Sequence, residues 1–327
     1  MAALFDTLAD KAINTGSVTE NDALELYTEG QKDVFGFLAR ASRIRYHFKN
    51  NLINLCGIIN AKSGVCPENC RFCAQSAHHH TDAPVYPLVS AEEIAQKGHI
   101  ARDNGVHMFS IVTSGTRIET DDEWKVIYRA IELLNEMGIK PCASLGMLDE
   151  TTARNLKSAG LYRYHHNLET SRSFFDNICS THEYAEDTGT VRIAREAGLT
   201  VCSGGIIGLG EKMEHRIEMA MTLRELDVDS VPINILNAIP GTPLENIDSL
   251  TPIEILLTVA LYRFILPDKD IKLCGGKEKN LRQLLPLAVV AGCNSLMTGN
   301  YLTTLGRDTP ADLEMIRDLG MEAKFEG

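Results

Sequence analysis

The sequence predicts an α/β fold, a (β/α)8 barrel of the TIM type preceded by a helical extension. Three observations support this prediction. After residue 50, short β-rich runs alternate with helical patterns of 12–18 residues. The alternation occurs eight times without a linker or low-complexity segment, and glycines mark the ends of several helical patterns. Strands that alternate with helices form parallel sheets, and eight such units close into a barrel.

The first 50 residues are expected to form the N-terminal helical extension. A helix is predicted from Thr19 to Tyr27, because Thr19 is a favourable N-cap followed by acidic residues. A second amphipathic helix is predicted over residues 32–47. The barrel is expected to occupy residues 51–300 and a C-terminal segment residues 301–327, so the whole chain, 1–327, forms one domain.

Eight barrel strands are predicted as β-rich runs bounded by turn residues. They are 52–60, 106–112, 140–145, 161–167, 199–207, 229–236, 270–275 and 293–298. The helices between them are expected near 90–104, 121–138, 149–159, 182–197, 212–227, 251–265 and 276–291. Gly138, Gly160 and Gly198 each stand where a helix must stop before the next strand.

Composition limits the class of protein. The net charge of −12 argues against nucleic acid or an anionic membrane as a partner, since both require a basic surface. The N-terminus carries acidic residues and lacks the apolar core of a signal peptide. No apolar run approaches the roughly 18 residues of a membrane helix. A cytoplasmic location is therefore expected, where nine cysteines are typical of metal or redox sites rather than disulfides.

Three cysteines, Cys66, Cys70 and Cys73, have the spacing C-x3-C-x2-C in VCPENCRFC. Thiolates select iron–sulfur clusters or zinc, and a structural zinc site would have a fourth Cys or His nearby. Three ligands instead leave one iron of a four-iron cluster open to a small molecule. The motif follows the first predicted strand, so it is expected at the end of the barrel where such enzymes hold their active sites.

A second set of thiols lies on predicted strands and alternates with apolar residues: Cys56, Cys142, Cys202 and Cys274. Because strand side chains alternate between two faces, the thiols share one face and the apolar residues the other. Apolar residues belong under the helices, so the thiols are expected to face the barrel interior, where they could hold a second cluster. The alternative is that each is a small buried hydrophobe. Cys179 and Cys293 are interpreted as structural, and His182 as a helix-start residue.

Five segments of the chain resemble the biotin synthases, a family of radical S-adenosylmethionine (SAM) enzymes. They are NAKSGVCPENCRFCAQS, YHHNLETS, VCSGGIIGLGE, VPINILNAIPGTPLE and AGCNSLMTGNYLTT, and the likeness runs from about residue 40 to 320. The resemblance implies that Cys66, Cys70 and Cys73 hold a [4Fe–4S] cluster that binds SAM. It also implies conversion of dethiobiotin to biotin, with an auxiliary iron–sulfur cluster as the sulfur donor.

The resemblance also assigns binding residues. Those implied to bind SAM are Phe72, Asn167, Glu169, Gly204 and Gly205, and those implied to bind dethiobiotin are Asn167, Asn234, His165, Thr303 and Thr304. An amide side chain offers a donor and an acceptor to the ureido ring, and a carboxylate accepts from two ribose hydroxyls. No side chain is implied as a catalytic acid or base.

The chain departs from the family at the auxiliary cluster. Biotin synthases of the better-known kind hold a [2Fe–2S] cluster with three Cys and one Arg. Cys142 and Cys202 match two of these ligands, whereas Ser110 and Lys272 replace the others. Cys56 and Cys274 stand where those enzymes tend to carry serine. We therefore expect an auxiliary cluster of the four-iron type held by Cys56, Cys142, Cys202 and Cys274. His165 replaces a usual asparagine, which makes the local substrate contacts differ.

The mechanism implied by the resemblance uses an electron from reduced flavodoxin or ferredoxin to cleave SAM. The resulting radical removes hydrogen from an unactivated C–H bond, while the barrel positions the reactants and excludes water. Relatives suggest a homodimer.

One alternative is a related radical SAM enzyme, similar to hydrogenase-maturation or methylornithine-forming enzymes. His165 and the altered ligands favour this alternative, and the Asn167–Asn234 pair disfavours it. A second is a non-catalytic zinc-binding or redox-sensing barrel.

Overall fold

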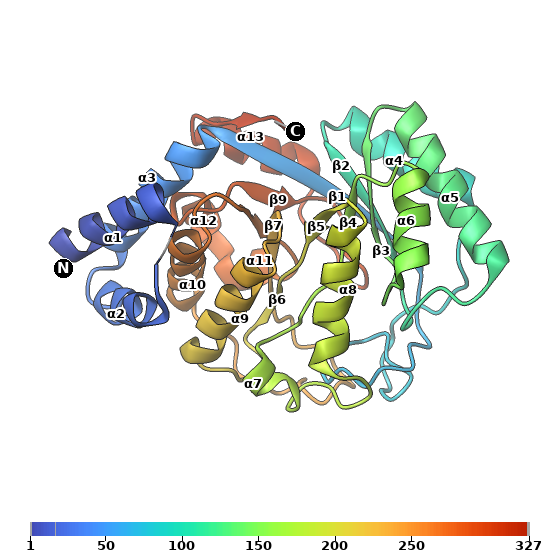
Figure 1. Ribbon diagram of the computed structural model, residues 1–327, viewed down its shortest axis with the longest axis horizontal. Coiled ribbons are helices and arrows are strands. Elements are labelled where there is room, and N and C mark those ends of the chain that lie inside the picture. The colour runs from blue at the N-terminus through green and yellow to red at the C-terminus, as the bar shows by residue number, and fades with distance from the viewer. Residues whose placement is uncertain (1, 17, 326–327) are drawn as a thin grey trace.

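The computed structural model describes residues 2–16 and 18–325, and it confirms the predicted barrel (Figure 1). Its strands are β1 (Leu52–Lys62), β2 (Met108–Thr113), β3 (Lys140–Ser144), β4 (Arg163–His165), β5 (Thr200–Cys202), β6 (Gly205–Ile207), β7 (Ser230–Ile235), β8 (Asp270–Leu273), β9 (Ser295–Met297) and β10 (Glu322–Ala323). They pair in parallel in the order β1-β2-β3-β4-β5-β7-β8-β9, and a β1–β9 pairing closes the ring. Residues 1 and 326–327, at the ends of the predicted domain, lie outside the described residues.

The predicted fifth strand, 199–207, is divided into β5 and β6 at Ser203 and Gly204. Gly204 approaches β7 so closely that a Cβ there would lie 2.1 Å from the carbonyl oxygen of Pro232. β6 then continues the pairing with β7 that β5 begins at Cys202. The break therefore turns the chain without opening the barrel wall.

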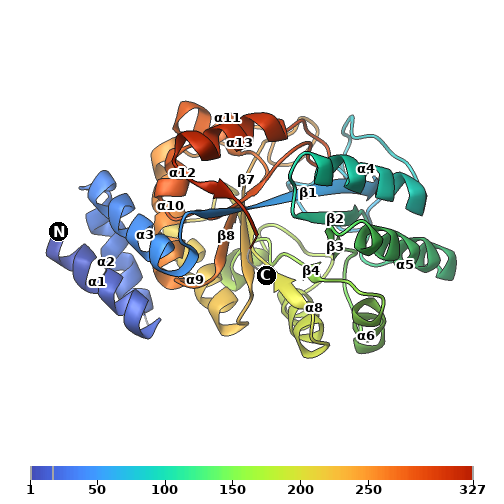
Figure 2. The same cartoon turned by 90° about the horizontal axis from the view of Figure 1, so that it is seen from above.

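Helices surround the barrel (Figure 2). Six of them match their predicted windows: α4 (Ala91–Asp103), α5 (Asp121–Glu136), α6 (Glu150–Ser158), α8 (Tyr184–Glu196), α9 (Met213–Glu225) and α10 (Pro252–Ile265). The other helices after β1 are α7 (Arg172–Phe175), α11 (Lys277–Leu281), η1 (Arg282–Leu284), α12 (Leu287–Val290) and α13 (Thr309–Asp318).

The prediction of one helix over 276–291 is wrong. That stretch contains α11, η1 and α12, and Arg282 has a left-handed φ of 52°. Pro286 follows, and its ring removes a backbone donor that a continuous helix would use. The helical pattern of the sequence therefore forms three short pieces.

The N-terminal extension consists of α1 (Ala2–Thr15), α2 (Glu20–Gly30) and α3 (Val34–Lys49), and it packs beside α10 (Figures 1 and 2). The predicted N-cap is confirmed, since the Thr19 side chain accepts from the Asp22 amide in a capping box. The first helix, α1, was not predicted as a separate element. Phe37 of α3 stacks near Phe264 of α10, with ring centroids 5.2 Å apart. Because the extension covers it, α10 is buried on every side from Ile255 to Ile265.

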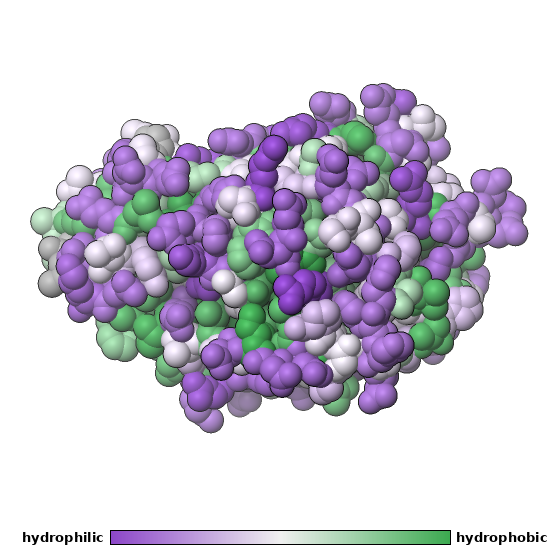
Figure 3. All heavy atoms as spheres, turned by 90° about the horizontal axis from the view of Figure 1, so that it is seen from below, coloured by the Kyte–Doolittle hydropathy of each residue, from purple (hydrophilic) through white to green (hydrophobic). Residues whose placement is uncertain are grey.

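The alternation of strand residues is as predicted. The apolar residues between the strand thiols lie in the main hydrophobic core: Ile53, Leu55, Leu145, Val201, Ile271 and Leu273. The carboxyl ends of the strands and their loops face downward in Figure 1, and Figure 3 shows this end with hydrophilic side chains around apolar atoms near the middle. Among the residues described, none of the helices has the length and apolar character needed to cross a bilayer.

Candidate active site

A cavity of about 380 Å³ lies inside the barrel. It collects most of the predicted site residues, since it is lined by Cys56, Cys66, Cys73, Cys142, His165, Asn167, Glu169, Cys202, Asn234, Cys274, Thr303 and Thr304. Four predicted residues are not part of this lining. They are Cys70, Phe72, Gly204 and Gly205. Phe72 packs against a small apolar cluster that includes Ile178 and Leu209.

The three-cysteine loop begins directly after β1 and is folded by its own backbone. The Cys66 amide donates to the carbonyl of Gln75 at 3.0 Å, and the Cys73 amide donates to the carbonyl of Cys70 at 2.9 Å. Burial raises the pKa of Cys66 and raises that of Cys73 to about 11. The three soft donors on one compact loop fit a thiolate-held iron–sulfur cluster, because the iron ions of the cluster would stabilise the ionised thiols.

The four strand thiols lie in the same cavity. Cys56, Cys142 and Cys202 project from β1, β3 and β5, and Cys274 directly follows β8. All are buried, with at most 4% of their surface exposed. Burial raises the pKa of Cys142 to about 12 and also raises that of Cys274. The structure thus brings together four thiols that lie far apart in the sequence.

Two buried cations face these thiols. Lys272 is 3% exposed, and its Nζ lies 3.7 Å from Cys202 Sγ. Although burial opposes the effect, the Lys272 charge helps to lower the pKa of Cys202 to about 6. Arg163 is 4% exposed, and its Nη1 has no hydrogen-bond partner among the described residues. Buried charges require a counter-charge, so this donor set fits an anionic, thiolate-bound group.

Asn167 and Glu169 follow β4 on the cavity wall. The Asn167 amide nitrogen donates to Glu169 Oε2 at 3.2 Å, whereas Asn167 Oδ1 is buried without a partner in the described structure. Burial, assisted by the charge of Asp187, raises the pKa of Glu169 to about 7. An unpartnered buried acceptor is costly, so Asn167 Oδ1 fits a site that receives a donor from a bound molecule.

Asn234 and His165 occupy the same wall. Asn234 Oδ1 accepts from the Gly275 amide at 3.1 Å, and this bond fixes the side-chain orientation. His165 lies close enough to Glu169 to offset part of the rise in its pKa, and close enough to Cys202 to contribute to the lowered pKa of that thiol. It therefore stands between the strand thiols and the Asn167–Glu169 pair.

Thr303 and Thr304 lie on a loop that covers one side of the cavity. The Tyr301 amide donates to the carbonyl of Thr304 at 3.0 Å, and Asn60 Nδ2 donates to the carbonyl of Leu302 at 3.0 Å. These bonds hold the loop against β1. Both threonines line the cavity.

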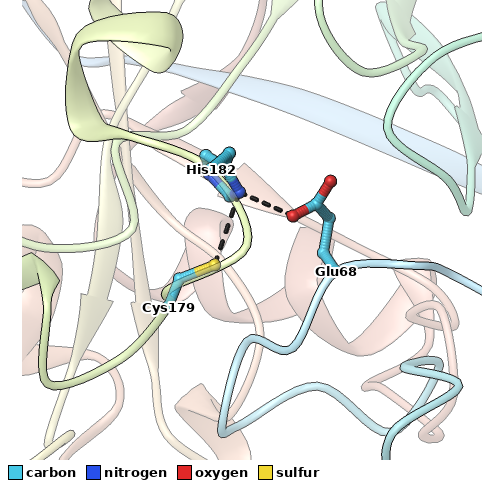
Figure 4. Close-up of side chains that lie close together, drawn as sticks. All are labelled: Glu68, Cys179 and His182. Carbon is cyan, nitrogen blue, oxygen red and sulfur yellow. Dashed lines mark hydrogen bonds and ion pairs between the residues drawn. The ribbon is translucent and has the colours of Figure 1, made fainter.

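Sequence reasoning missed a group beside the three-cysteine loop (Figure 4). Cys179 Sγ lies 3.8 Å from Cys70 Sγ and 3.4 Å from His182 Nδ1, which in turn lies 2.7 Å from Glu68 Oε2. His182 directly precedes the N-cap of α8, Glu183, and its side chain also belongs to this group. The Cys-x2-His spacing in CSTH was the available signal.

Hydrogen bonds among Cys70, Cys179 and His182 shift the pKa values of all three residues. The hydrogen bond from Cys70 lowers the pKa of Cys179 to about 3 and raises that of Cys70. Although burial opposes it, hydrogen bonds to Asp187, Cys179 and Glu68 raise the pKa of His182 to about 11. In the metal-free protein, Cys70 is thus the member of the pair that carries the proton.

Two family models match the chain. That of the radical SAM superfamily matches residues 61–223, and that of the Biotin and Thiamin Synthesis associated domain matches residues 232–322. A biotin synthase of Geotalea uraniireducens is 52% identical over 324 residues, covering 99% of this chain and 98% of that protein. A biotin synthase of Pelobacter propionicus is 54% identical over 322 residues, covering 98% of each.

Solved structures show the same fold at low identity. A methylornithine synthase has a TM-score of 0.84 at 21% identity and covers 97% of each chain. A maturase of the [FeFe]-hydrogenase has a TM-score of 0.84 at 16% identity and covers all of this chain and 76% of its own. At these identities the likeness concerns the fold alone.

Proposed function

This chain belongs to the biotin synthase family, and from that premise we propose that it converts dethiobiotin to biotin by radical insertion of sulfur. One observation carries the proposal: two thiols of the loop and all four strand thiols line a single cavity. A radical generator and a sulfur source must both reach one substrate, and this arrangement allows it. The alternative of a hydrogenase-maturation or methylornithine-forming enzyme shares the barrel, but the solved structures of these enzymes are only 16–21% identical to this chain.

Cys66, Cys70 and Cys73 would hold the [4Fe–4S] cluster that binds SAM. Once bound, the cluster and SAM supply a radical that removes hydrogen from an unactivated C–H bond, and the auxiliary cluster supplies sulfur. Radical abstraction requires no side-chain base. The residues of this chain therefore serve to bind, orient and exclude water.

We assign SAM to the side of the cavity lined by Asn167 and Glu169, with Phe72, Gly204 and Gly205, which lie outside the lining, as further contacts. Glu169 would accept from the ribose hydroxyls. Asn167 would reach both SAM and substrate, because its Oδ1 has no described partner and its amide nitrogen is held by Glu169. Dethiobiotin would lie between Asn167, His165 and Asn234 at its ureido ring and the Thr303–Thr304 loop at its carboxylate.

We further propose that the auxiliary cluster is of the four-iron type, held by Cys56, Cys142, Cys202 and Cys274. Lys272 is a charge partner rather than a ligand, because an ammonium group has no lone pair to give iron. The Lys272 Nζ lies 3.7 Å from Cys202 Sγ, which supports that role. The buried guanidinium of Arg163 would be a second charge partner.

Iron content tests the ligand set. Anaerobically reconstituted protein should hold about eight irons per chain, and the variant C56S/C274S about four, as two four-iron clusters require. The matched control C293S alters a buried cysteine outside the cavity and should retain all of them. About four irons in the wild-type protein, unchanged in C56S/C274S, would contradict the proposal.

Activity tests the substrate. Anaerobic incubation with dethiobiotin, SAM and a chemical reductant should yield biotin and 5′-deoxyadenosine, both measured by mass spectrometry. N167A should lose both products because it removes the shared contact. Formation of 5′-deoxyadenosine without biotin in the wild-type protein would reject dethiobiotin as the substrate.

Reduced flavodoxin or ferredoxin would be the physiological electron donor, and we propose a homodimer in the cytoplasm. The reducing cytoplasm suits a chain whose nine cysteines are all free. Sedimentation equilibrium at several concentrations would test the dimer, and a monomer throughout would exclude it.

A further inference from the structure

The side chains of Glu68, Cys179 and His182 form a hydrogen-bonded group centred on the His182 imidazole. Glu68 accepts from Thr116 Oγ1 at 2.5 Å and from His182 Nδ1 at 2.7 Å, and Asp187 Oδ2 lies 3.3 Å from His182 Nε2. The side chains of Glu68 and His182 are 14% and 11% exposed, and that of Asp187 only 4%. The imidazole is thus held at both nitrogens between two carboxylates, with its ring close to Cys179.

The same segment grips the three-cysteine loop. The Asn69 amide donates to Thr181 Oγ1 at 3.1 Å, and the Ser180 amide donates to Asn69 Oδ1 at 2.9 Å. The Arg71 amide donates to the carbonyl of Ile178 at 3.0 Å. These bonds fix Cys179 relative to Cys70, although the two residues lie 109 positions apart.

Cys179 is not placed to be a fourth ligand at the open position. Cys66 and Cys73 line the cavity, whereas Cys70 and Cys179 do not. Cys179 therefore contacts Cys70 outside the lining of the cavity. Both nitrogens of His182 have carboxylate partners, so the imidazole is fixed in place beside Cys179.

We propose that Cys179 donates an S–H hydrogen bond to the Cys70 sulfur when Cys70 binds iron, and that the His182–Glu68 pair positions Cys179 for this. The inference rests on the proposed function, since it takes Cys70 as a cluster ligand. An iron-bound Cys70 has no proton to give, and a second thiolate 3.8 Å away would be repelled by it. With Cys70 bound to iron, the 3.8 Å contact between the two sulfurs is a hydrogen bond if Cys179 is the donor.

The consequence is an easier reduction of the cluster. Reduction adds negative charge, and a hydrogen bond to a ligand sulfur stabilises that charge, so such bonds help to set the potentials of iron–sulfur clusters. Cys179 accordingly acts through Cys70 on the reduction potential of the cluster, and it is not a catalytic residue.

The test is an anaerobic redox titration followed by electron paramagnetic resonance, using the signal that shifts when SAM is added. C179A should lower the equilibrium constant for one-electron reduction by threefold to tenfold, where tenfold corresponds to about 59 mV. C179S keeps a donor and should stay nearer to wild type than C179A. C293A removes a buried thiol elsewhere and should leave the potential unchanged.

A second measurement detects the proton directly. In D2O, electron–nuclear double resonance of the reduced cluster should show an exchangeable deuteron coupling in the wild type and C179S that is absent from C179A. If C179A fails to retain its cluster, C179S and H182A are compared instead. The deuteron coupling should be present in C179S and weaker in H182A, which loses the group that positions Cys179.

The outcomes separate the two proposals. A wild-type protein without any SAM-responsive cluster signal would overturn the proposed function. A wild-type protein with that signal, but with an unchanged or higher potential in C179A, would leave the function standing and overturn the role of Cys179.

Discussion

At the scale of the residue, Glu169 shows how the cavity changes the chemistry of one carboxyl group. It is held beside Asn167 with a positive φ of 60°, and its carbonyl oxygen accepts from the Ile206 amide at 2.8 Å. Burial, with the charge of Asp187, raises its pKa to about 7. Without a bound partner, ionisation of Glu169 above that pH therefore opposes folding.

We expect E169Q to stabilise the metal-free protein in a pH-dependent way. The folded-state pKa lies above the unfolded value, so Glu169 costs nothing below about pH 4.5, and stability falls as the pH rises through about 7. E169Q should match wild type at pH 4.5 and exceed it at pH 8 by up to about 3 kcal/mol, since one pKa unit is worth about 1.4 kcal/mol. Urea unfolding at both pH values measures this.

E123Q is the matched control. Although burial opposes it, the hydrogen bond from Lys62 at 2.7 Å holds the pKa of Glu123 below its usual value. E123Q should therefore lose stability at pH 8 relative to wild type. A gain of equal size in both variants would mean that net charge, rather than the cavity, is responsible.

At the scale of the element, the break between β5 and β6 depends on close backbone approach. A Cβ at Gly204 would meet the carbonyl oxygen of Pro232 at 2.1 Å, and one at Gly205 would meet that of Glu169 at 2.4 Å. Backbone atoms cannot move aside as a flexible side chain can. The two glycines thus let β6, β7 and the segment that follows β4 come together beside the cavity.

G204A should destabilise the protein by about 1–3 kcal/mol, as overpacking of a filled interior does. G189A provides the opposite case, because Gly189 lies inside α8 and a Cβ at this position would have no atom within 4 Å. Alanine there should stabilise by up to about 1 kcal/mol through helix propensity. Denaturant midpoints of the two variants should move in opposite directions.

At the scale of the whole molecule, one buried arginine holds the region where the barrel closes. Arg263 of α10 is fully buried and donates to the carbonyl oxygens of Gly292, Pro267 and Lys269 and to Asn294 Oδ1, at 2.7–2.9 Å. Asn294 Nδ2 in turn donates to Asp270 Oδ1 at 2.9 Å, next to the β8–β9–β1 junction.

R263M should destabilise the protein by at least about 3 kcal/mol, because several buried acceptors lose their donor and each costs about 1–3 kcal/mol. R102M, at a half-exposed arginine on α4, should change stability by less than about 1 kcal/mol. Thermal unfolding of both variants tests the comparison, and equal shifts would deny Arg263 this role in closure.

One aromatic residue near the end of the chain, Phe325, contacts two of the strand thiols. Phe325 packs against the cluster of Cys56, Met108 and Cys142, and its ring lies 5.9 Å from that of Tyr162. F325A should therefore speed the loss of auxiliary-cluster iron to a chelator several-fold, followed by absorbance. F35A, which alters an exposed phenylalanine, should not change that rate.

Much of this architecture could be predicted from local sequence pattern. The period-2 alternation around Cys56, Cys142, Cys202 and Cys274 was sufficient to orient them inward, because the two faces of a strand have fixed directions. The barrel followed from the repeated β/α pattern. The last helical window failed because periodicity cannot show that Arg282 takes a left-handed conformation.

By itself, the sequence determined the barrel, the three-cysteine loop and the inward face of each strand, since these depend on neighbours a few residues apart. Only the tertiary structure decided that Cys179 touches Cys70, that Lys272 and Arg163 face the strand thiols, and that Asn167 Oδ1 lacks a partner among the described residues. The physical reason is that such contacts join segments some 70 to 110 residues apart. Which loops and strands meet depends on how the whole barrel closes, and no local pattern records that.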